Sequence, residues 1–206
     1  RSTPLYSSAA SDVYKRQRYK SHTHEGKEIG IKVIDASEMV KLLSLPHIYR
    51  QYMKRKNFGV DYDPFAHYHE RDQFMIFYLG TADNIVGFTK QKKYRYQEDN
   101  YSTIDNFDSQ DLAGLESVVH ANTIPISHIT LDMEIQWASD HFVRHFYMGS
   151  GYEQGSEYKA SYKGFEWWTG TEWSTDKKLY KRLCRRDSRI DSFRDLGNLS
   201  LISDKS

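Results

Sequence analysis

Alternation of apolar and polar residues predicts β-strands in several segments of the chain. The segment 29–36 (IGIKVIDA) alternates in this way and predicts a first strand. Two runs rich in β-forming residues, 74–79 and 85–94, flank a polar turn at 80–84 and predict a hairpin. The segment 128–136 (HITLDMEIQ) alternates strictly, which predicts a strand with one buried face.

Apolar residues spaced by three and four predict helices elsewhere. Ser37 and Ser109 are suitable N-caps, and Pro46 divides the first helical segment into two short helices. The last helix is basic and amphipathic. The predicted helical segments are 37–56, 109–122, the opening part of 139–153, and 174–187.

The order of these elements predicts the fold class. Further strands are expected at 101–107 and, as one or two strands, at 152–168. Strands that alternate with helices after an antiparallel hairpin indicate an α/β (α+β) fold with a mixed sheet covered by helices on both faces.

The chain divides by composition into four parts. Residues 1–17 resemble a translated sequencing-library adapter, because 12–17 (DVYKRQ) reverse-translates to a transposon end, and we expect this part to be disordered and the source to be environmental DNA. Residues 18–28 form a polar lead-in. Residues 29–173 are predicted to be a single domain, followed at 174–206 by the basic helix and a disordered tail.

Charge and cysteine content narrow the function classes. The formal net charge is +1, and leaving out residues 1–17 gives 26 Lys and Arg against 27 Asp and Glu. A chain this close to neutral has no overall electrostatic footprint for nucleic acid. Cys184 is the single cysteine, which excludes an internal disulfide and fits a reducing compartment. No apolar run is long enough to span a bilayer, so we expect a cytoplasmic protein. We expect it to be a monomer or a homodimer.

The stretch 139–153 (SDHFVRHFYMGSGYE), after its alternating segment, resembles a motif of the Gcn5-related N-acetyltransferase (GNAT) superfamily. Asp140 stands where the family has Asn and Val143 where it has Ala, whereas Tyr147, Gly151 and the aromatic Tyr152 agree. The order of elements over roughly 29–165 supports the resemblance. It implies a GNAT-like, mostly antiparallel sheet.

The resemblance also implies an activity, the transfer of an acetyl group from acetyl-CoA to a primary amine of a small molecule or peptide. Tyr147 would act as general acid, and Glu134 or Asp132 as general base. The pyrophosphate of acetyl-CoA would bind at a loop that opens the helix after the hairpin, although Leu115 occupies a position where the family has a small residue. The implied cofactor-binding residues are Gln110, Leu112, Ala113, Gly114 and Asp140.

Other interpretations of the same residues stay open. The chain can be a GNAT-fold binding or structural module without catalysis, including one of viral origin. Alternatively, the basic C-terminal segment and the Trp-rich stretch 163–173 can serve a nucleic-acid-binding accessory protein. Tyr147 can simply pack beside an apolar stripe of its predicted helix.

Two groups of histidines resemble metal ligands. His141 and His145 would share one face of the predicted helix, but a zinc protease motif would need Glu in place of Phe142. His67 and His69 alternate, with Asp72 close behind, in a connection between elements, where contact with the acceptor substrate is the preferred interpretation. We therefore expect no metal.

Overall fold

The computed structural model places most of the chain in two compact units. The larger unit comprises residues 15–144, and the smaller unit comprises 1–14 with 145–206. This division lies inside the range 29–173, which the sequence predicts to be one domain. The residues that the structure describes are 6–10, 22–39, 42–58, 63–66, 72–95, 112–150, 155–169 and 171–187.

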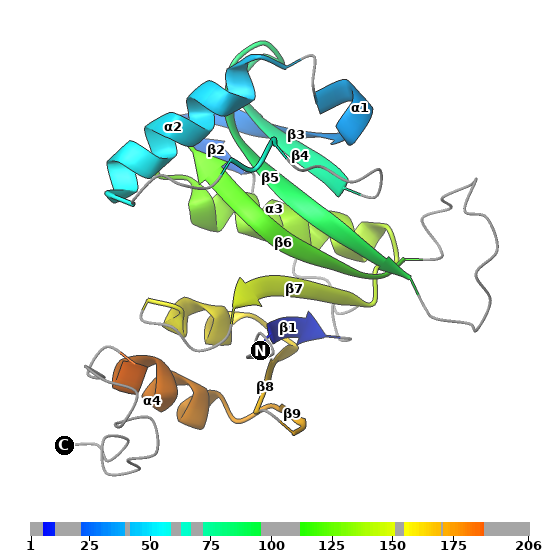
Figure 1. The fold of residues 1–206 in the computed structure, drawn as a ribbon, viewed down its shortest axis with the longest axis vertical. Helices are drawn as coiled ribbons and strands as arrows, with labels where there is room; N and C mark the ends of the chain where they lie inside the picture. Colours follow the sequence, from blue (N-terminus) through cyan, green and yellow to red (C-terminus); the bar gives the residue numbers. More distant parts are fainter. Residues whose placement is uncertain are drawn as a thin grey trace. The chain divides into compact units, whose positions relative to one another are not determined.

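The larger unit contains an antiparallel sheet in which each strand pairs with the next one along the chain (Figure 1). Its strands are β2 (Thr23–His24), β3 (Lys27–Asp35), β4 (Asp72–Leu79), β5 (Ile85–Arg95) and β6 (Leu112–Asn122). The predicted first strand and the predicted hairpin are both confirmed as β3 and as β4 with β5. Every side chain from Asp72 to Phe77 is buried, which shows that β4 is covered on both of its faces.

Helices cover the two faces of this sheet. Helices α1 (Ala36–Met39) and α2 (Ser44–Lys56) lie on one face, where α2 buries Leu45 and Ile48 against Phe74, Phe88 and other core residues. Helix α3 (Ser127–Asp140) lies on the opposite face (Figure 1). The predicted α+β class, a mostly antiparallel sheet with helices on both faces, is therefore confirmed, and it is consistent with a GNAT-like fold.

The predicted division of 37–56 into two helices is also confirmed, but Pro46 is not its cause. Pro46 lies in the first turn of α2, where its missing N–H is not needed, and the interruption precedes Ser44.

The described part of the smaller unit has four strands and one long helix. Strands β7 (His145–Ser150), β1 (Tyr6–Ala10), β8 (Phe165–Trp168) and β9 (Trp173–Ser174) pair in that order and antiparallel. The 3-10 helix η2 (Glu157–Ser161) and helix α4 (Lys177–Asp187) complete it. The predicted C-terminal basic helix is confirmed as α4, and the Trp-rich stretch forms the β8–β9 hairpin. The predicted disorder of 1–17 does not hold for Tyr6–Ala10, whose backbone pairs with two strands.

Three predicted elements are wrong in type. The predicted helix 109–122 is strand β6, the predicted strand 128–136 lies within helix α3, and the predicted helix in 139–153 is mostly strand β7. The predicted strands at 152–168 are only partly right, because η2 precedes β8. The predicted strand 101–107 and the tail after Asp187 lie outside the described residues.

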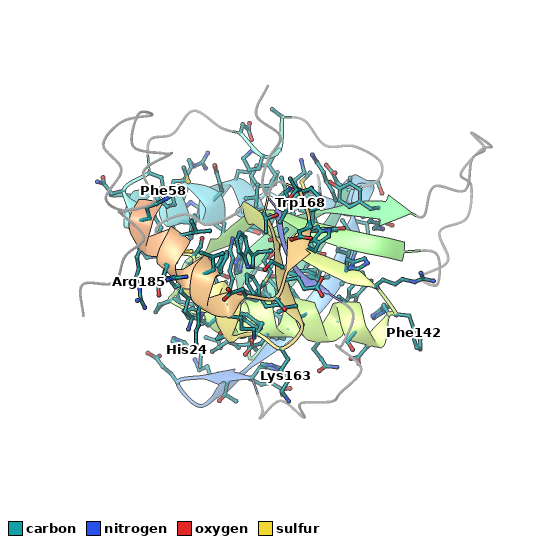
Figure 2. The ribbon with its side chains drawn as sticks, turned by 90° about the horizontal axis from the view of Figure 1, so that it is seen from below. His24, Phe58, Phe142, Lys163, Trp168 and Arg185 are labelled. Atoms are coloured by element: carbon teal, nitrogen blue, oxygen red, sulfur yellow. The ribbon has the colours of Figure 1, made fainter. Side chains whose placement is uncertain are left out.

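Helix α3 ends in a turn where the sequence predicts a helix to begin. The amide of Phe142 donates to the carbonyl of Ser139, and the amide of Val143 donates to that of Ala138. Phe142 has a φ of 57°, a left-handed conformation that ends helices, and its ring is 57% exposed beyond the end of α3 (Figure 2). No helix in the described ranges is both long and apolar enough to cross a membrane.

Candidate functional site

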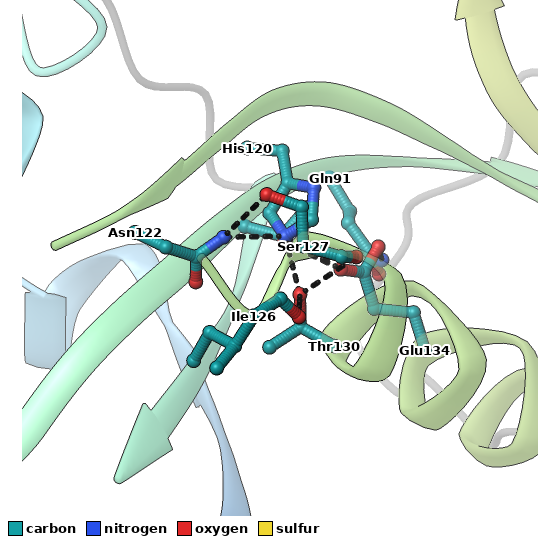
Figure 3. Close-up of polar contacts among 8 residues, drawn as sticks. Gln91, His120, Asn122, Ile126, Ser127, Thr130 and Glu134 are labelled. Atoms are coloured by element: carbon teal, nitrogen blue, oxygen red, sulfur yellow. Dashed lines mark hydrogen bonds and ion pairs between the residues drawn. The ribbon is translucent and has the colours of Figure 1, made fainter. Parts of the chain in front are cut away.

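A cluster of polar side chains lies between β5, β6 and α3, on the face of the sheet that α3 covers (Figure 3). Thr89 and Phe88 are neighbours on β5 and therefore face opposite sides of the sheet, so Phe88 faces α2 and Thr89 faces α3. We call this group the Glu134 cluster. Its members are Thr89, Gln91, His120, Asn122, Ser127, Thr130 and Glu134.

Glu134 is the carboxyl group at the centre of the cluster, and its side chain is fully buried. The Thr89 hydroxyl donates to Glu134 Oε1 at 2.7 Å, and Gln91 Nε2 donates to Oε2 at 3.3 Å. Burial disfavours the charged carboxylate more than these two donors favour it, and it raises the pKa of Glu134 to about 8. Glu134 is therefore mostly protonated at pH 7.

His120 connects this carboxyl group to the surface. Its Nε2 lies 3.6 Å from Glu134 Oε1 and 2.6 Å from the Thr130 hydroxyl, and its side chain is 21% exposed. Burial, with a smaller contribution from His128, lowers the pKa of His120 to about 4. The imidazole is therefore neutral at pH 7.

Asn122 holds His120 from the end of β6. Its Nδ2 lies 3.1 Å from His120 Nε2 and donates to the Ser127 hydroxyl at 3.3 Å. The opposing residue on β5 is Gly87, and a Cβ there would overlap the Asn122 side-chain oxygen. Arg55 of α2 donates to the Asn122 backbone carbonyl at 2.7 Å, which brings a positive charge to the same strand end.

The environments of Glu134 and His120 displace their pKa values in opposite directions. Such pairs of titratable groups are typical of acid–base sites, although structural networks also produce them. Among the described residues, Gln91 Oε1 and Asn122 Oδ1 have no hydrogen-bond partner despite their burial. Buried acceptors without a partner are costly, and a catalytic role is one of the explanations for keeping them.

We expect Gly87→Ala to disturb this site through Asn122. The added methyl group displaces the Asn122 side chain and breaks its contacts with His120 and Ser127, so the free energy of unfolding falls by about 1–3 kcal/mol. Chemical denaturation measures the loss, and NMR titration of His120 should show its pKa moving up toward an ordinary value.

The Asn122→Ala background provides the control for this prediction. Because the shorter alanine side chain at position 122 would not meet the new methyl group, Gly87→Ala should cost far less there than in the parent protein. If Gly87→Ala lowered the free energy of unfolding equally in both backgrounds, the loss would have a cause other than the contact with Asn122.

The structure places the predicted site residues on other types of element than the family motif implies. Glu134 is in the cluster, but it lies on a helix rather than a strand. Tyr147 lies on β7 of the smaller unit, and Asp140 is the last residue of α3, where it accepts a hydrogen bond from Gln136 at 2.6 Å. Asp140 therefore does not open a helix, as the motif requires.

The predicted phosphate loop is not a loop that opens a helix. Leu112, Ala113 and Gly114 belong to β6, and Leu115 is fully buried in the same strand. Gln110 lies outside the described residues. The junction between the strand after the hairpin and the following helix is instead at 122–127.

The histidines that resemble metal ligands in the sequence are not arranged as predicted where the structure describes them. His141 caps the end of α3, where its ring stacks on Trp137 at 3.9 Å, and His145 begins β7, so the two do not share a helix face. His67 and His69 lie outside the described residues. Asp72 pairs with Lys90 at 3.0 Å inside the larger unit.

Sequence reasoning missed most of the Glu134 cluster. Thr89 and Gln91 lie two apart in a predicted strand, which places both polar side chains on the same face of it. His120 and Asn122 have the same spacing, but the prediction of a helix at 109–122 concealed it.

Comparisons with known proteins are sparse for this chain. No family model and no curated protein matches it. Among solved structures, it is similar to the C-terminal domain (DUF2156) of an Agrobacterium fabrum protein assigned as a lysylphosphatidylglycerol synthetase, with a TM-score of 0.46 and 6% identity. The similarity covers 93% of this chain and 53% of that one, so this chain spans about half of its length.

Proposed function

We propose that this chain is an N-acyltransferase in which His120 accepts the proton of an amine substrate and Glu134 sets the proton affinity of His120. The observation that carries the proposal is the buried Glu134 carboxyl group 3.6 Å from a neutral, partly exposed histidine. The order of elements in the larger unit, a hairpin followed by a strand and a helix, is the reason for choosing acyl transfer over other acid–base reactions.

The proton movements of this reaction suit the pair. A primary amine attacks the thioester carbonyl of the donor, a C–N bond forms and the C–S bond breaks. The amine gives up a proton and the leaving thiolate takes one up. His120 is the member of the pair that reaches solvent, so it would contact the amine. The buried Glu134 acts through His120, and its ionisation at high pH increases the basicity of the imidazole.

For the donor, we propose acetyl-CoA, with its pyrophosphate at the start of α3. Helix N-termini attract phosphate because their amides point outward and the helix dipole is positive there. Among the described residues, no side chain caps the start of α3, and Arg55 lies at the adjoining end of β6. This site replaces the one predicted at 110–115.

We expect Glu134→Gln to lower the rate of acetyl transfer about 100-fold above pH 8, where the parent carboxyl group is ionised, and to abolish the rise of the rate with pH. Glutamine resembles the protonated carboxyl group in shape but does not ionise, so the rise through about pH 8 should disappear. The assay measures free thiol released from acetyl-CoA with a panel of primary amines, after calorimetry has established binding of acetyl-CoA.

Asp132→Asn is the matched control, because Asp132 is half-buried on the same helix outside the cluster. It should leave the rate and the pH profile unchanged. A folded protein that does not bind acetyl-CoA, or a Glu134→Gln variant with parental activity above pH 8, would contradict the proposal.

A binding or structural module without catalysis is the second candidate. The observation that favours it is the strand β6, which occupies the residues predicted to form the phosphate loop. Absence of acetyl-CoA binding and of thiol release with every amine would support this interpretation.

A further inference from the structure

A group of aromatic side chains and one carboxylate shares a face of the smaller unit. Tyr147 on β7 and Glu166 on β8 are both in register with residue 8 of β1, so their side chains point to the same side of the sheet. Trp168 lies two residues after Glu166 and pairs with Trp173 of β9. These four residues, Tyr147, Glu166, Trp168 and Trp173, form what we call the Trp173 face.

The opposite face of the same strands packs against α4. Phe165 and Trp167 are buried there, with their rings 4.7 Å and 5.9 Å from that of Tyr180. The core of the smaller unit is therefore on the α4 side. The aromatic residues of the Trp173 face are additional to that core and are not needed to anchor α4.

The rings of the Trp173 face meet at steep angles. Trp173 lies 5.5 Å from Trp168 at 62° and 6.3 Å from Tyr147 at 46°, measured between centroids and ring planes. Trp173 is 42% exposed, and Trp168, labelled in Figure 2, is partly exposed. Two neighbouring rings inclined in this way can contact one small group from two sides, whereas a sugar or a nucleobase binds best on a flat platform or between parallel rings.

Glu166 gives this aromatic face a negative charge. It is partly buried, and among the described residues it forms neither a hydrogen bond nor an ion pair. On β7, the ring centroid of His145 lies 6.3 Å from that of Tyr147. Ring faces attract cations through their quadrupoles, and a carboxylate beside them adds direct attraction.

We propose that the Trp173 face binds an organic cation, an alkylammonium or quaternary ammonium group, between the rings of Trp168, Trp173 and Tyr147 with Glu166 as its counter-ion. The charge complementarity and the inclined rings are the two observations that select this ligand class. The proposal concerns the smaller unit alone and does not rest on acyl transfer by the Glu134 cluster.

Choline titrated into the full chain tests this proposal. NMR of the indole N–H signals and tryptophan fluorescence should show saturable changes at Trp168 and Trp173. The neutral carbon isostere of choline, in which a tert-butyl group replaces the trimethylammonium group, should bind at least about fivefold more weakly. Equal binding of the isostere would show an ordinary apolar surface and would overturn the proposal.

Two variants locate the ligand, and each has a matched control. Trp173→Leu should abolish saturable binding, whereas Tyr158→Leu, at an exposed aromatic residue elsewhere on the same unit, should not. Glu166→Gln should weaken choline binding about threefold or more without affecting the isostere. Glu172→Gln, at an exposed position of the same hairpin, should change neither. Binding that survives Trp173→Leu would overturn the proposal, and circular dichroism verifies that each variant is folded.

Discussion

Replacing Lys90 with methionine should destabilise the protein by about 3–5 kcal/mol. The Lys90 ammonium lies 3.0 Å from Asp72 and donates to the Pro64 carbonyl at 3.1 Å, and only 2% of Lys90 and 3% of Asp72 is exposed. Methionine has a similar volume but no charge, so Asp72 would be left as a buried carboxylate without its cation. Chemical denaturation gives the loss as a change in the free energy of unfolding.

Two further variants separate the effect of the lost charge on stability from the effect of changed packing. Lys92→Met removes a lysine from an exposed position of the same strand and should change stability by less than about 0.5 kcal/mol. Combining Lys90→Met with Asp72→Leu should recover much of the lost stability, because no unpaired charge remains buried. A Lys90→Met variant as stable as Lys92→Met would show that the ion pair contributes nothing to the fold.

The second large effect should be a fall in stability of about 2 kcal/mol between pH 6.5 and pH 8, caused by Glu134. The fold raises the pKa of Glu134 from 4.5 to about 8, so the folded state holds a proton that the unfolded chain has already released. The stabilisation from this proton is complete below pH 4.5 and is lost as the pH rises through 8.

His120 has the opposite effect at lower pH. The fold lowers its pKa from 6.5 to about 4, so its contribution is present above pH 6.5 and is lost as the pH falls toward 4. The two contributions oppose each other between pH 4.5 and 6.5, where stability should be nearly flat. Above pH 6.5 the contribution of His120 no longer changes, so of the two groups only Glu134 causes the fall in stability.

Glu134→Gln identifies the group responsible. Because glutamine does not titrate, the difference in stability between pH 6.5 and 8 should nearly vanish in this variant and persist in Asp132→Asn. Urea denaturation at closely spaced pH values measures both. A fall that persists unchanged in Glu134→Gln would assign it to another group.

Patterns within single segments of the sequence were sufficient to predict the elements whose residues fit only one type of secondary structure. The hairpin β4–β5 has two β-rich runs around a polar turn, and α4 has apolar residues at helical spacing among lysines and arginines. The first strand β3 has an equally clear pattern. These elements were enough to establish the α+β class.

The segments around the Glu134 cluster have patterns that fit two conformations. A helix could be lined by Leu112, Leu115 and Val119. They form strand β6 instead, because the edge of β5 offers backbone hydrogen bonds along its length. In 128–136, alternation suggests a strand, yet Leu131 and Ile135 are also four apart and share one face of α3.

The fold class, the β4–β5 hairpin and the amphipathic C-terminal helix could be predicted from the amino-acid sequence, because their signals lie between residues close together in the chain. The candidate site depends instead on how distant segments pack. Thr89, His120 and Glu134 come from three elements, and the burial that displaces the pKa values of His120 and Glu134 exists only when α3 lies on the sheet. No local pattern encodes that burial, which is why Glu134 was identified from the sequence without its partners or its environment.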